Sequence, residues 1–371
     1  MKFAIITHVD HLRAGDSWYG YSAYVREMNL WGRNASQILI VAPVSGDVPS
    51  KIHLAYEHPH IKFTKIPAVS ITSFAEVMRA MVLIPVIVFK LFRVMRSADH
   101  VHLRCPGTIG LLGCCVQVFF PKKPKTAKYA GNWDPKAKQP RSYRFQKWLL
   151  SNTFFTKNMK VLVYGEWPDQ SKNIVPFFTA SYNRSKIEPL RDRSFVPPFK
   201  FIFVGTLSEG KRPGYAVELV NSLRQLGIDC RLDFYGDGAE RTSIEKLVAR
   251  NSLEPFVKLH GNETAAVVEE AYKNSHFLVL PSRSEGWPKV VAEAMFWGCV
   301  PLVTSISCVR WMLAEGERGI LLTLDHEADI KSIAACISEE NILKDMSVKG
   351  QTWSQNYTLD KFEEEIKTML Q

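Results

Sequence analysis

The feature that most constrains the fold of this chain is a repeated alternation of short apolar runs with longer stretches of helical character. Lys2–Val9 is an apolar run of strand length, and a glycine-containing loop separates it from the helical stretch Tyr21–Trp31. The pattern restarts in the second half, where the apolar run Phe199–Val204 precedes the helical stretch Pro213–Leu226. Strands that alternate with helices predict βαβ units and a parallel, doubly wound sheet. We therefore expect an α/β protein.

The alternation occurs in two series, which predicts two domains. Ser181–Pro198 separates them, because it combines charges, serine and three prolines, the composition of a linker. The expected domains are residues 1–180 and 199–352, with a linker at 181–198. Two such domains that meet across a cleft place a ligand at the carboxyl ends of the strands. The expected strands are Lys2–Val9, Gln37–Val41, His100–Leu103, Thr126–Ala130, Phe199–Val204, Cys230–Tyr235, Val257–His260, His276–Leu280 and Val300–Val303.

Charge divides unevenly between the two halves. Of 371 residues, 23% are charged and 46% are apolar, which is typical of a soluble globular chain. The formal net charge is +10, yet residues 1–178 carry 24 Lys and Arg against 10 Asp and Glu, whereas residues 179–371 carry 23 against 27. The N-terminal half is thus expected to face something anionic, which could be a lipid headgroup layer, a phosphorylated acceptor or nucleic acid.

Cysteine usage and apolar segments indicate the compartment. The seven cysteines are odd in number and contain no CxxC spacing, and the chain begins without a signal-peptide pattern. We expect a cytosolic protein with buried free thiols and no metal site. Met81–Phe89 is apolar but has only nine residues, interrupted by Pro85, whereas a membrane span needs roughly 18. With its basic flanks it is either a helix that lies in a membrane interface or a core helix of the first domain.

Pro281–Gly298 (PSRSEGWPKVVAEAMFWG) has the pattern of a phosphate site. A predicted strand ends there, a loop follows, and Pro288 suits the first turn of the next helix, where its missing N–H costs nothing. The free N–H groups of Lys289 and Val290 then point out of the helix tip, and the helix dipole favours an anion there. Lys289 adds a full positive charge.

Two carboxylates bracket this phosphate site. Glu293 lies one helical turn after Lys289, and its carboxylate can accept hydrogen bonds from two adjacent hydroxyls, as a ribose offers. Glu285 lies in the preceding loop and would reach past the phosphates to a sugar. The spacing therefore predicts a site for a nucleoside diphosphate sugar.

At these residues the chain resembles a known family. Glu285 and Glu293 match the E-x7-E motif of the family 4 retaining glycosyltransferases ("glycosyl transferases group 1"). The resemblance implies a GT-B fold, in which two Rossmann-like domains face each other across a cleft and a C-terminal helix, here 353–371, crosses back to the first domain. It also implies that Glu293 binds the ribose, that Glu285 contacts the donor sugar, and that the backbone of Gly286, Trp287 and Pro288 takes part in sugar recognition.

Further turns extend the resemblance. Phe203–Pro213 is similar to the family's VGRLxxxKG loop, which implies that Gly205, Thr206, Lys211 and Arg212 approach the diphosphate. The family commonly has arginine at the position of Thr206. Turns at Gly236 and Asn262 match family turns near the nucleotide, and Gly20 in the first domain fits a loop that faces donor and acceptor. Arg104 and Asn132 are the expected acceptor-binding residues, and the expected catalytic residues are Glu285, Lys211 and Asp134, where many relatives have a histidine or aspartate.

The resemblance implies transfer of a sugar, with retained configuration, from a nucleoside diphosphate sugar to a hydroxyl of a polysaccharide or lipid-linked acceptor. The basic first half together with Met81–Phe89 suggests a role in bacterial cell-surface polysaccharide synthesis at the inner face of the membrane. The resemblance implies that no cofactor or metal is needed. A catalytically inactive binding protein of the same fold remains the alternative. An oxidoreductase is disfavoured because no GxGxxG follows the first strand of either half, and a nucleic-acid-binding protein would not explain the acidic C-terminal half.

Overall fold

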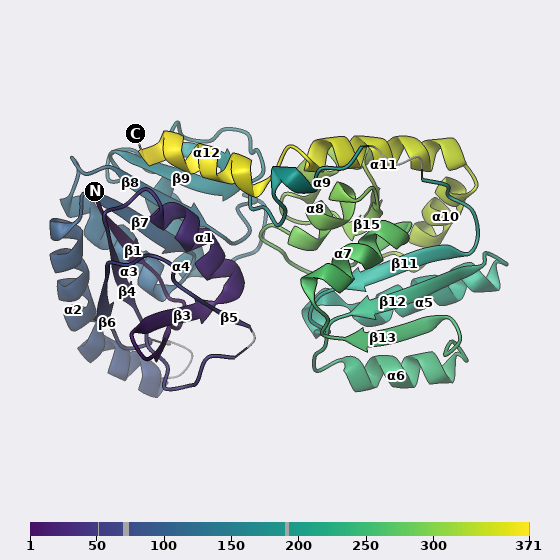
Figure 1. Ribbon diagram of the computed structural model, residues 1–371, viewed down its shortest axis with the longest axis horizontal. Coiled ribbons are helices and arrows are strands. Elements are labelled where there is room, and N and C mark those ends of the chain that lie inside the picture. The colour runs from purple at the N-terminus through teal and green to yellow at the C-terminus, as the bar shows by residue number, and fades with distance from the viewer. Residues whose placement is uncertain (51, 70–73, 190–192, 371) are drawn as a thin grey trace. The chain divides into compact units, whose positions relative to one another are not determined.

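The computed structural model describes residues 1–50, 52–69, 74–189 and 193–370, and for residues 74–81 only the backbone. The chain divides into two compact units, which are Met1–Phe177 with Glu363–Gln371, and Phe178–Phe362. Each unit contains a parallel sheet between helices, as the strand–helix alternation predicts (Figure 1).

The sheet of the first unit has seven parallel strands in the order β10-β9-β8-β7-β1-β4-β6. Its central strands are buried and rich in β-branched and aromatic residues, as parallel strands covered on both faces must be. The strands are β1 (Lys2–Ile6), β4 (Gln37–Ala42), β6 (Ile61–Lys65), β7 (His100–Cys105), β8 (Lys125–Tyr129), β9 (Met159–Tyr164) and β10 (Ile174–Phe177).

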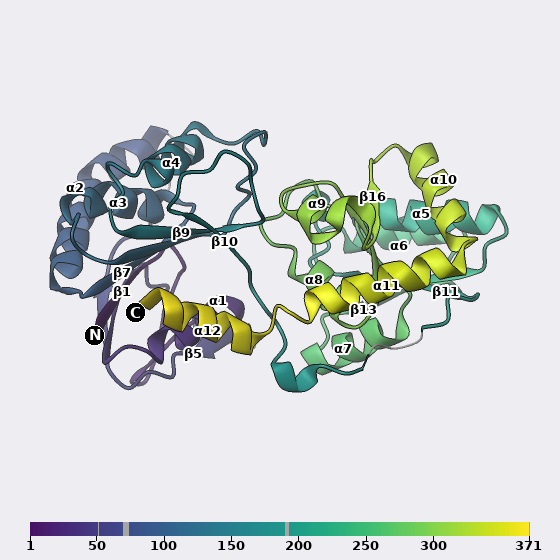
Figure 2. The same cartoon turned by 90° about the horizontal axis from the view of Figure 1, so that it is seen from above.

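Helices cover both faces of this sheet. On one side lie α2 (Phe74–Ser97), α3 (Thr108–Val116) and α4 (Arg141–Ser151), and on the other lie α1 (Ser22–Gly32) and the end of α12 (Leu359–Leu370) (Figure 2). The split follows from the strand order. The crossover from β1 to β4 runs in one direction along the sheet, and those from β6 to β7, β8 and β9 run in the other. Right-handed connections therefore place their helices on opposite faces.

The glycine-containing loop expected after β1 is instead a small antiparallel sheet. It consists of β2 (Leu12–Ala14), β3 (Ser17–Tyr21) and β5 (His53–Ala55). Gly20 lies within β3 opposite Leu54, and a Cβ added to it would lie 3.1 Å from Cγ2 of Val25. Gly20 therefore serves close packing onto the next helix; it lies in a strand and not in the expected loop, and its contact with the donor stays a prediction.

The apolar segment Met81–Phe89 forms part of α2. The side of the helix that carries Ile87 and Leu91 is buried in the core, whereas Val82 and Phe89 are 74% and 61% exposed. The segment thus contributes to the core on one side and leaves apolar side chains in solvent on the other. Within the described ranges, no helix is both long enough and apolar enough to cross a membrane.

The sheet of the second unit has six parallel strands in the order β13-β12-β11-β14-β15-β16. Helix α5 connects β11 to β12 and α6 connects β12 to β13. Helix α7 then leads back to β14, and α8 connects β14 to β15. The strands are β11 (Phe199–Val204), β12 (Cys230–Tyr235), β13 (Val257–Gly261), β14 (Phe277–Leu280), β15 (Val300–Thr304) and β16 (Ile320–Leu322). The helices are α5 (Pro213–Gln225), α6 (Arg241–Arg250), α7 (Ala265–Asn274), α8 (Lys289–Phe296), α9 (Val309–Met312), α10 (His326–Ile337) and α11 (Glu340–Ser354).

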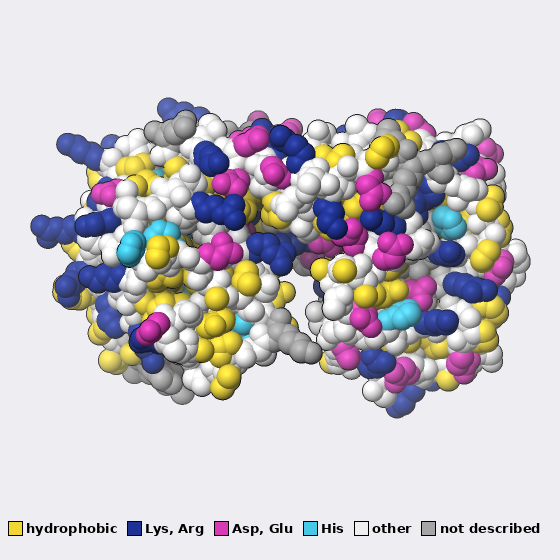
Figure 3. Space-filling model, viewed as in Figure 1, with side chains coloured by type: hydrophobic (Ala, Val, Ile, Leu, Met, Phe, Trp, Pro, Cys, Tyr) yellow, Lys and Arg dark blue, Asp and Glu magenta, His cyan; other side chains and the backbone are white. Residues whose placement is uncertain are grey.

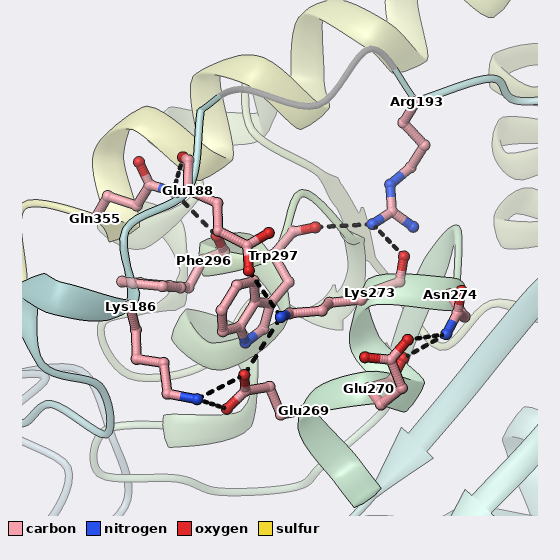
Figure 4. Close-up of polar contacts among 10 residues, drawn as sticks. All are labelled: Lys186, Glu188, Arg193, Glu269, Glu270, Lys273, Asn274, Phe296, Trp297 and Gln355. Carbon is pink, nitrogen blue, oxygen red and sulfur yellow. Dashed lines mark hydrogen bonds and ion pairs between the residues drawn. The ribbon is translucent and has the colours of Figure 1, made fainter. Parts of the chain in front are cut away.

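The predicted linker 181–198 lies within the second unit, although its residues 190–192 are outside the described ranges. Ion pairs fasten it to α7. Lys186 binds Glu269 at 3.0 Å, and Glu188 accepts from Lys273 at 2.8 Å (Figure 4). The Lys273 ammonium also lies 4.1 Å from the ring centre of Trp297, a cation–π contact.

Arg193 fastens the far end of the same segment. Its guanidinium donates to the backbone carbonyls of Lys273 at 3.1 Å and Trp297 at 2.7 Å (Figure 4). It also donates to the Ser275 carbonyl. These carbonyls lie at the carboxyl ends of α7 and α8, where helices leave acceptors without internal partners and where the dipole favours a cation. One side chain thereby joins the linker to two helix ends.

Substitution Arg193→Ala should destabilise the second unit by about 3 kcal/mol, because it removes charge-assisted hydrogen bonds and leaves partly buried carbonyls without a donor. Calorimetry should show a fall of several degrees in the melting temperature. Lys186→Ala is the matched control, since it removes an exposed linker ion pair worth below about 1 kcal/mol. Equal effects of the two substitutions would contradict the anchoring role of Arg193.

Candidate functional site

The strand order of the second unit reverses between β11 and β14, so the loops after these two strands meet at the carboxyl edge of the sheet. In open α/β sheets this switch point is where ligands bind. The two loops are residues 205–212 and 281–288, and they contain most of the residues that the sequence predicted for donor binding.

Two glycine turns bring the first of these loops against its neighbour. Gly205 and Gly236 both have φ +140°, a conformation that side-chain-bearing residues rarely adopt. A Cβ added to Gly236 would lie 2.0 Å from the Gly205 carbonyl oxygen. The backbone N–H of Gly205 donates to Tyr235 at 2.9 Å. The loops after β11 and β12 are therefore in direct backbone contact.

Lys211 and Glu285 form an ion pair across the switch point. Their Nζ and Oε1 atoms are 2.7 Å apart, and the side chains are 26% and 16% exposed. The two residues are 74 positions apart in the chain, and the backbone N–H of Arg283 ties the same loops together by donating to Gly210 at 2.8 Å. A partly exposed lysine held by a carboxylate can exchange that carboxylate for phosphate oxygens when an anion arrives.

Helix α8 begins at Lys289 directly after Pro288, as the sequence pattern predicts. The loop before it is held by the Gly286 carbonyl, which accepts from the Ser307 hydroxyl at 2.9 Å and from the Cys308 thiol at 3.3 Å. The Trp287 ring is buried, with Trp311, Trp353 and Tyr357 around it, and Val290 is half-buried in the first turn. Trp287 is therefore positioned to contact a ligand through its backbone and not through its ring.

Glu293 is held by two partners that the sequence analysis missed. Its Oε1 accepts from the Ser181 hydroxyl and its Oε2 from the Tyr272 hydroxyl at 3.3 Å. Tyr272 is fully buried, and burial followed by the nearby Glu293 carboxylate raises its pKa well above the usual value, so it remains a neutral donor. These contacts fix the orientation of the carboxylate on α8, yet both partners lie far from Glu293 in sequence and belong to no motif.

The remaining predicted donor residues line the same edge of the sheet. Thr206 and Asn262 are exposed, in the loops after β11 and β13. Arg212 is half-buried in a left-handed conformation with φ 50°, directly before α5. They share one edge with Lys211 and Glu285.

In the first unit, Arg104 belongs to a buried charge cluster. Its Nη1 lies 2.9 Å from Oε1 of Glu27, and Nζ of the fully buried Lys128 lies 3.0 Å from the same oxygen. Burial alone would raise the pKa of Glu27, but the two cations outweigh it and hold that pKa at about 2. The sequence missed Glu27 and Lys128, because a charged residue inside a helix or strand pattern gives no signal of its partner.

Asn132 and Asp134 lie in the loop after β8, where their side chains stabilise turns. Asn132 Oδ1 accepts from the backbone N–H of Asp134 at 2.8 Å, and Asp134 Oδ1 from that of Lys136 at 2.8 Å. This is the ordinary turn-forming use of these residues. His8, which follows β1, lies near enough to Arg104 for their charges to interact. Burial and then the charge of Arg104 lower the pKa of His8. Among the described residues, no three His, Cys, Asp or Glu side chains form a group that could hold a metal ion.

Comparison with known proteins identifies the second unit. Residues 188–353 match the profile of the family described as "Glycosyl transferases group 1". The match covers somewhat less than half of the chain and lies almost wholly within the second unit. The resemblance of the Glu285–Glu293 segment to glycosyl transferases group 1 is thus confirmed.

Curated relatives match part of the chain. An uncharacterized glycosyltransferase from Methanocaldococcus jannaschii is 26% identical over 161 residues, which are 43% of this chain and 44% of the relative. Lipopolysaccharide 1,6-galactosyltransferase from Salmonella typhimurium is 31% identical over 140 residues, 36% of this chain and 37% of the relative. Each match spans less than half of the relative's length.

Solved structures match the whole chain. Sucrose-phosphate synthase from Thermosynechococcus elongatus has a TM-score of 0.67 at 16% identity, covering 100% of this chain and 98% of that one. HepE from Anabaena, solved with UDP and glucose, has a TM-score of 0.68 at 14% identity and covers 100% and 99%. Such identities show the fold alone, and it is the predicted one: two Rossmann-like α/β domains of the GT-B type.

The buried cluster in the first unit predicts a pH dependence. The pKa of Glu27 falls from 4.5 to about 2 on folding. Its contribution to stability is therefore present above pH 4.5 and is lost as the pH falls towards 2. Glu27→Gln should cost about 3–5 kcal/mol at neutral pH, because Arg104 and Lys128 lose their counter-charge. The free energy of unfolding of the parent and of the Glu27→Gln variant should be measured between neutral pH and acid. The difference between the two should shrink as the pH falls; a constant difference would refute the pairing.

Proposed function

We propose that this chain is a glycosyltransferase that moves a sugar from a nucleoside diphosphate sugar to a hydroxyl acceptor with retained anomeric configuration. The observation that carries the proposal is the Lys211–Glu285 pair at the β11/β14 switch point, where Glu285 lies in the loop that leads into α8, the helix that carries Glu293. The family of residues 188–353 supports it, as do relatives that are themselves named glycosyltransferases.

Different residues of the site bind the ribose, the diphosphate and the sugar of the donor. Glu293, oriented by Ser181 and Tyr272, accepts from the ribose hydroxyls. The amides of Lys289 and Val290 receive the diphosphate together with Lys211. Lys211 then exchanges Glu285 for phosphate oxygens, and the released carboxylate is free to accept from hydroxyls of the donor sugar.

In the reaction, the bond between the sugar's anomeric carbon and the phosphate oxygen breaks, and a bond from that carbon to the acceptor oxygen forms on the same face. The acceptor hydroxyl gives its proton to the departing phosphate oxygen. Charge that grows on the diphosphate is stabilised by Lys211, Lys289 and the tip of α8, so that the proposal requires no metal or cofactor. Catalysis is therefore mainly electrostatic.

The acceptor is proposed to be a polysaccharide or lipid-linked sugar of bacterial cell-surface synthesis, handled at the cytoplasmic face of the membrane with peripheral contact to anionic lipid. The basic charge of residues 1–178 supports this, and one relative is named a lipopolysaccharide galactosyltransferase. In the first unit Arg104 and Lys128 both bind the carboxylate of Glu27 near the carboxyl ends of β7 and β8. The presence of Lys211, Glu285 and Glu293 with their polar contacts favours an enzyme over an inactive binding protein.

A charge exchange tests the site. Lys211→Ala and Glu293→Ala should each lower the rate of UDP-sugar hydrolysis, or of transfer, by at least about a hundredfold, because each removes a charged contact to the donor. The double variant Lys211→Glu with Glu285→Lys should restore the thermal stability of the ion pair without restoring turnover. Thermal-shift measurements over a panel of nucleoside diphosphate sugars identify the donor as the compound that raises the melting temperature most.

Arg283→Ala is the matched control for these variants. Arg283 forms an exposed ion pair of 2.7 Å with Glu209 between the same two loops. Its loss should leave hydrolysis within about twofold, since an exposed pair contributes little. Full turnover by the Lys211 and Glu293 variants would reject the proposed site.

A further inference from the structure

A second feature lies at the opposite edge of the first unit's sheet. The connections from α3 to β8 and from α4 to β9 both enter the sheet at the amino ends of its strands, away from the carboxyl edge where Arg104 and Asn132 lie. We call the aromatic and lysine side chains around these connections, which are exposed except for the buried Lys125, the amino-edge surface. It consists of Phe89, Phe119, Trp148, Phe154, Lys122, Lys125, Lys157, Lys160 and Lys172.

The two connections repeat one pattern. Each contains a Phe-Phe pair followed within a few residues by lysine, at Phe119–Lys122 and at Phe154–Lys157. Phe119 is 73% exposed and Phe154 is 71% exposed. Large aromatic side chains this exposed mark a surface that binds something, particularly where several are neighbours.

Neighbouring helices extend the aromatic part. Phe92 of α2 lies 6.4 Å from Phe119 between ring centres, and Trp148 of α4 lies 6.1 Å from Phe155. Phe89 and Trp148 are themselves 61% and 53% exposed. The aromatic rings therefore continue from the connections onto the outer sides of the helices.

A lysine-lined hollow adjoins these aromatics. It has a volume of about 700 Å³, and its lining includes Thr153 and Pro121 from the two connections. Five lysines line it, and its described lining contains no Asp or Glu. Lys125 is the most buried of the five, with its amine donating to the Phe120 carbonyl at 2.7 Å. The lining lysines are Lys122, Lys125, Lys157, Lys160 and Lys172.

The combination selects the partner. A soluble polyanion would account for the lysines but not for the exposed rings, and an apolar protein surface would account for the rings but not for the uncompensated charge. An anionic bilayer matches both, because aromatic rings favour the membrane interface and lysines favour its negative surface. In Figure 3, Lys and Arg side chains (dark blue) project from the side of the first unit that carries α2.

We propose that the amino-edge surface docks the first unit on an anionic bilayer, with a phospholipid phosphate in the lysine-lined hollow and with Phe119 and Phe154 inserted at the interface. This rests on the peripheral membrane contact in the proposed function and names the surface that makes it. The hollow is distinct from the acceptor region, since the two lie at opposite edges of the sheet.

Sedimentation of the full chain with phosphatidylglycerol-containing and pure phosphatidylcholine vesicles tests the proposal. The chain should bind the former, and added salt should weaken binding. Phe119→Ser with Phe154→Ser should lower the partition coefficient by about tenfold per ring removed. Lys122→Gln with Lys157→Gln should lower it by about fivefold per lysine.

Leu226→Ser with Lys246→Gln is the matched control, because it removes an exposed apolar residue and a lysine from the second unit and should bind like the parent. Equal binding to both vesicle types, undiminished binding by the Phe119/Phe154 variant, or binding of inorganic phosphate without any vesicle binding would overturn the proposal. UDP-sugar hydrolysis without vesicles should be the same in all forms. If no form hydrolyses the UDP-sugar while vesicle binding is intact, the proposed function is rejected and the docking surface is not.

Discussion

The backbone contact between the turns at Gly205 and Gly236 is the constraint on which the candidate site depends. No side chain fits between them, so the loops after β11 and β12 stack directly. The stem of Lys211 passes along the bare face of Gly205, since a Cβ added there would lie 3.4 Å from its Cδ and Cε. Gly236 thus allows the close packing of the two turns, and Gly205 borders the path by which the lysine amine reaches Glu285. The geometry rests on strand ends and backbone, which a ligand displaces less easily than a flexible loop.

Local pattern predicted more of the second unit than of the first. The strand–helix alternation predicted both sheets, and Lys211 and Glu285 were each assigned to a diphosphate sugar, which required them to be close. The contacts of Ser181 and Tyr272 with Glu293 could not be predicted, because they join residues far apart in sequence with no motif of their own. The small sheet around Gly20 was missed because its strands are only three to five residues long and a glycine inside one resembles a loop. Asp134 is a turn former in the structure, and its catalytic role stays a prediction.

The positive charge of the first half is distributed according to burial. Arg104 and Lys128 are held inside by Glu27, where desolvation makes a single shared carboxylate essential to both. The lysines at the amino ends of β8 and β9 lie instead around a hollow whose described lining contains no acidic residue. Net charge by itself would not have distinguished a counter-ion for the fold from a surface for a partner, because both uses contribute equally to the total. The positions of the carboxylates separate them.

Helix α12 bears on how the molecule is made. The second unit ends at Phe362, and residues from Glu363 onwards belong to the first unit. Ile366 is wholly buried there. During synthesis the segment 1–177 leaves the ribosome early but lacks this part of its core until the whole second unit has followed. The half that is translated first is therefore finished last. A nascent chain must keep an apolar gap beside its first sheet open, or shielded by a chaperone, for the time needed to translate the intervening residues.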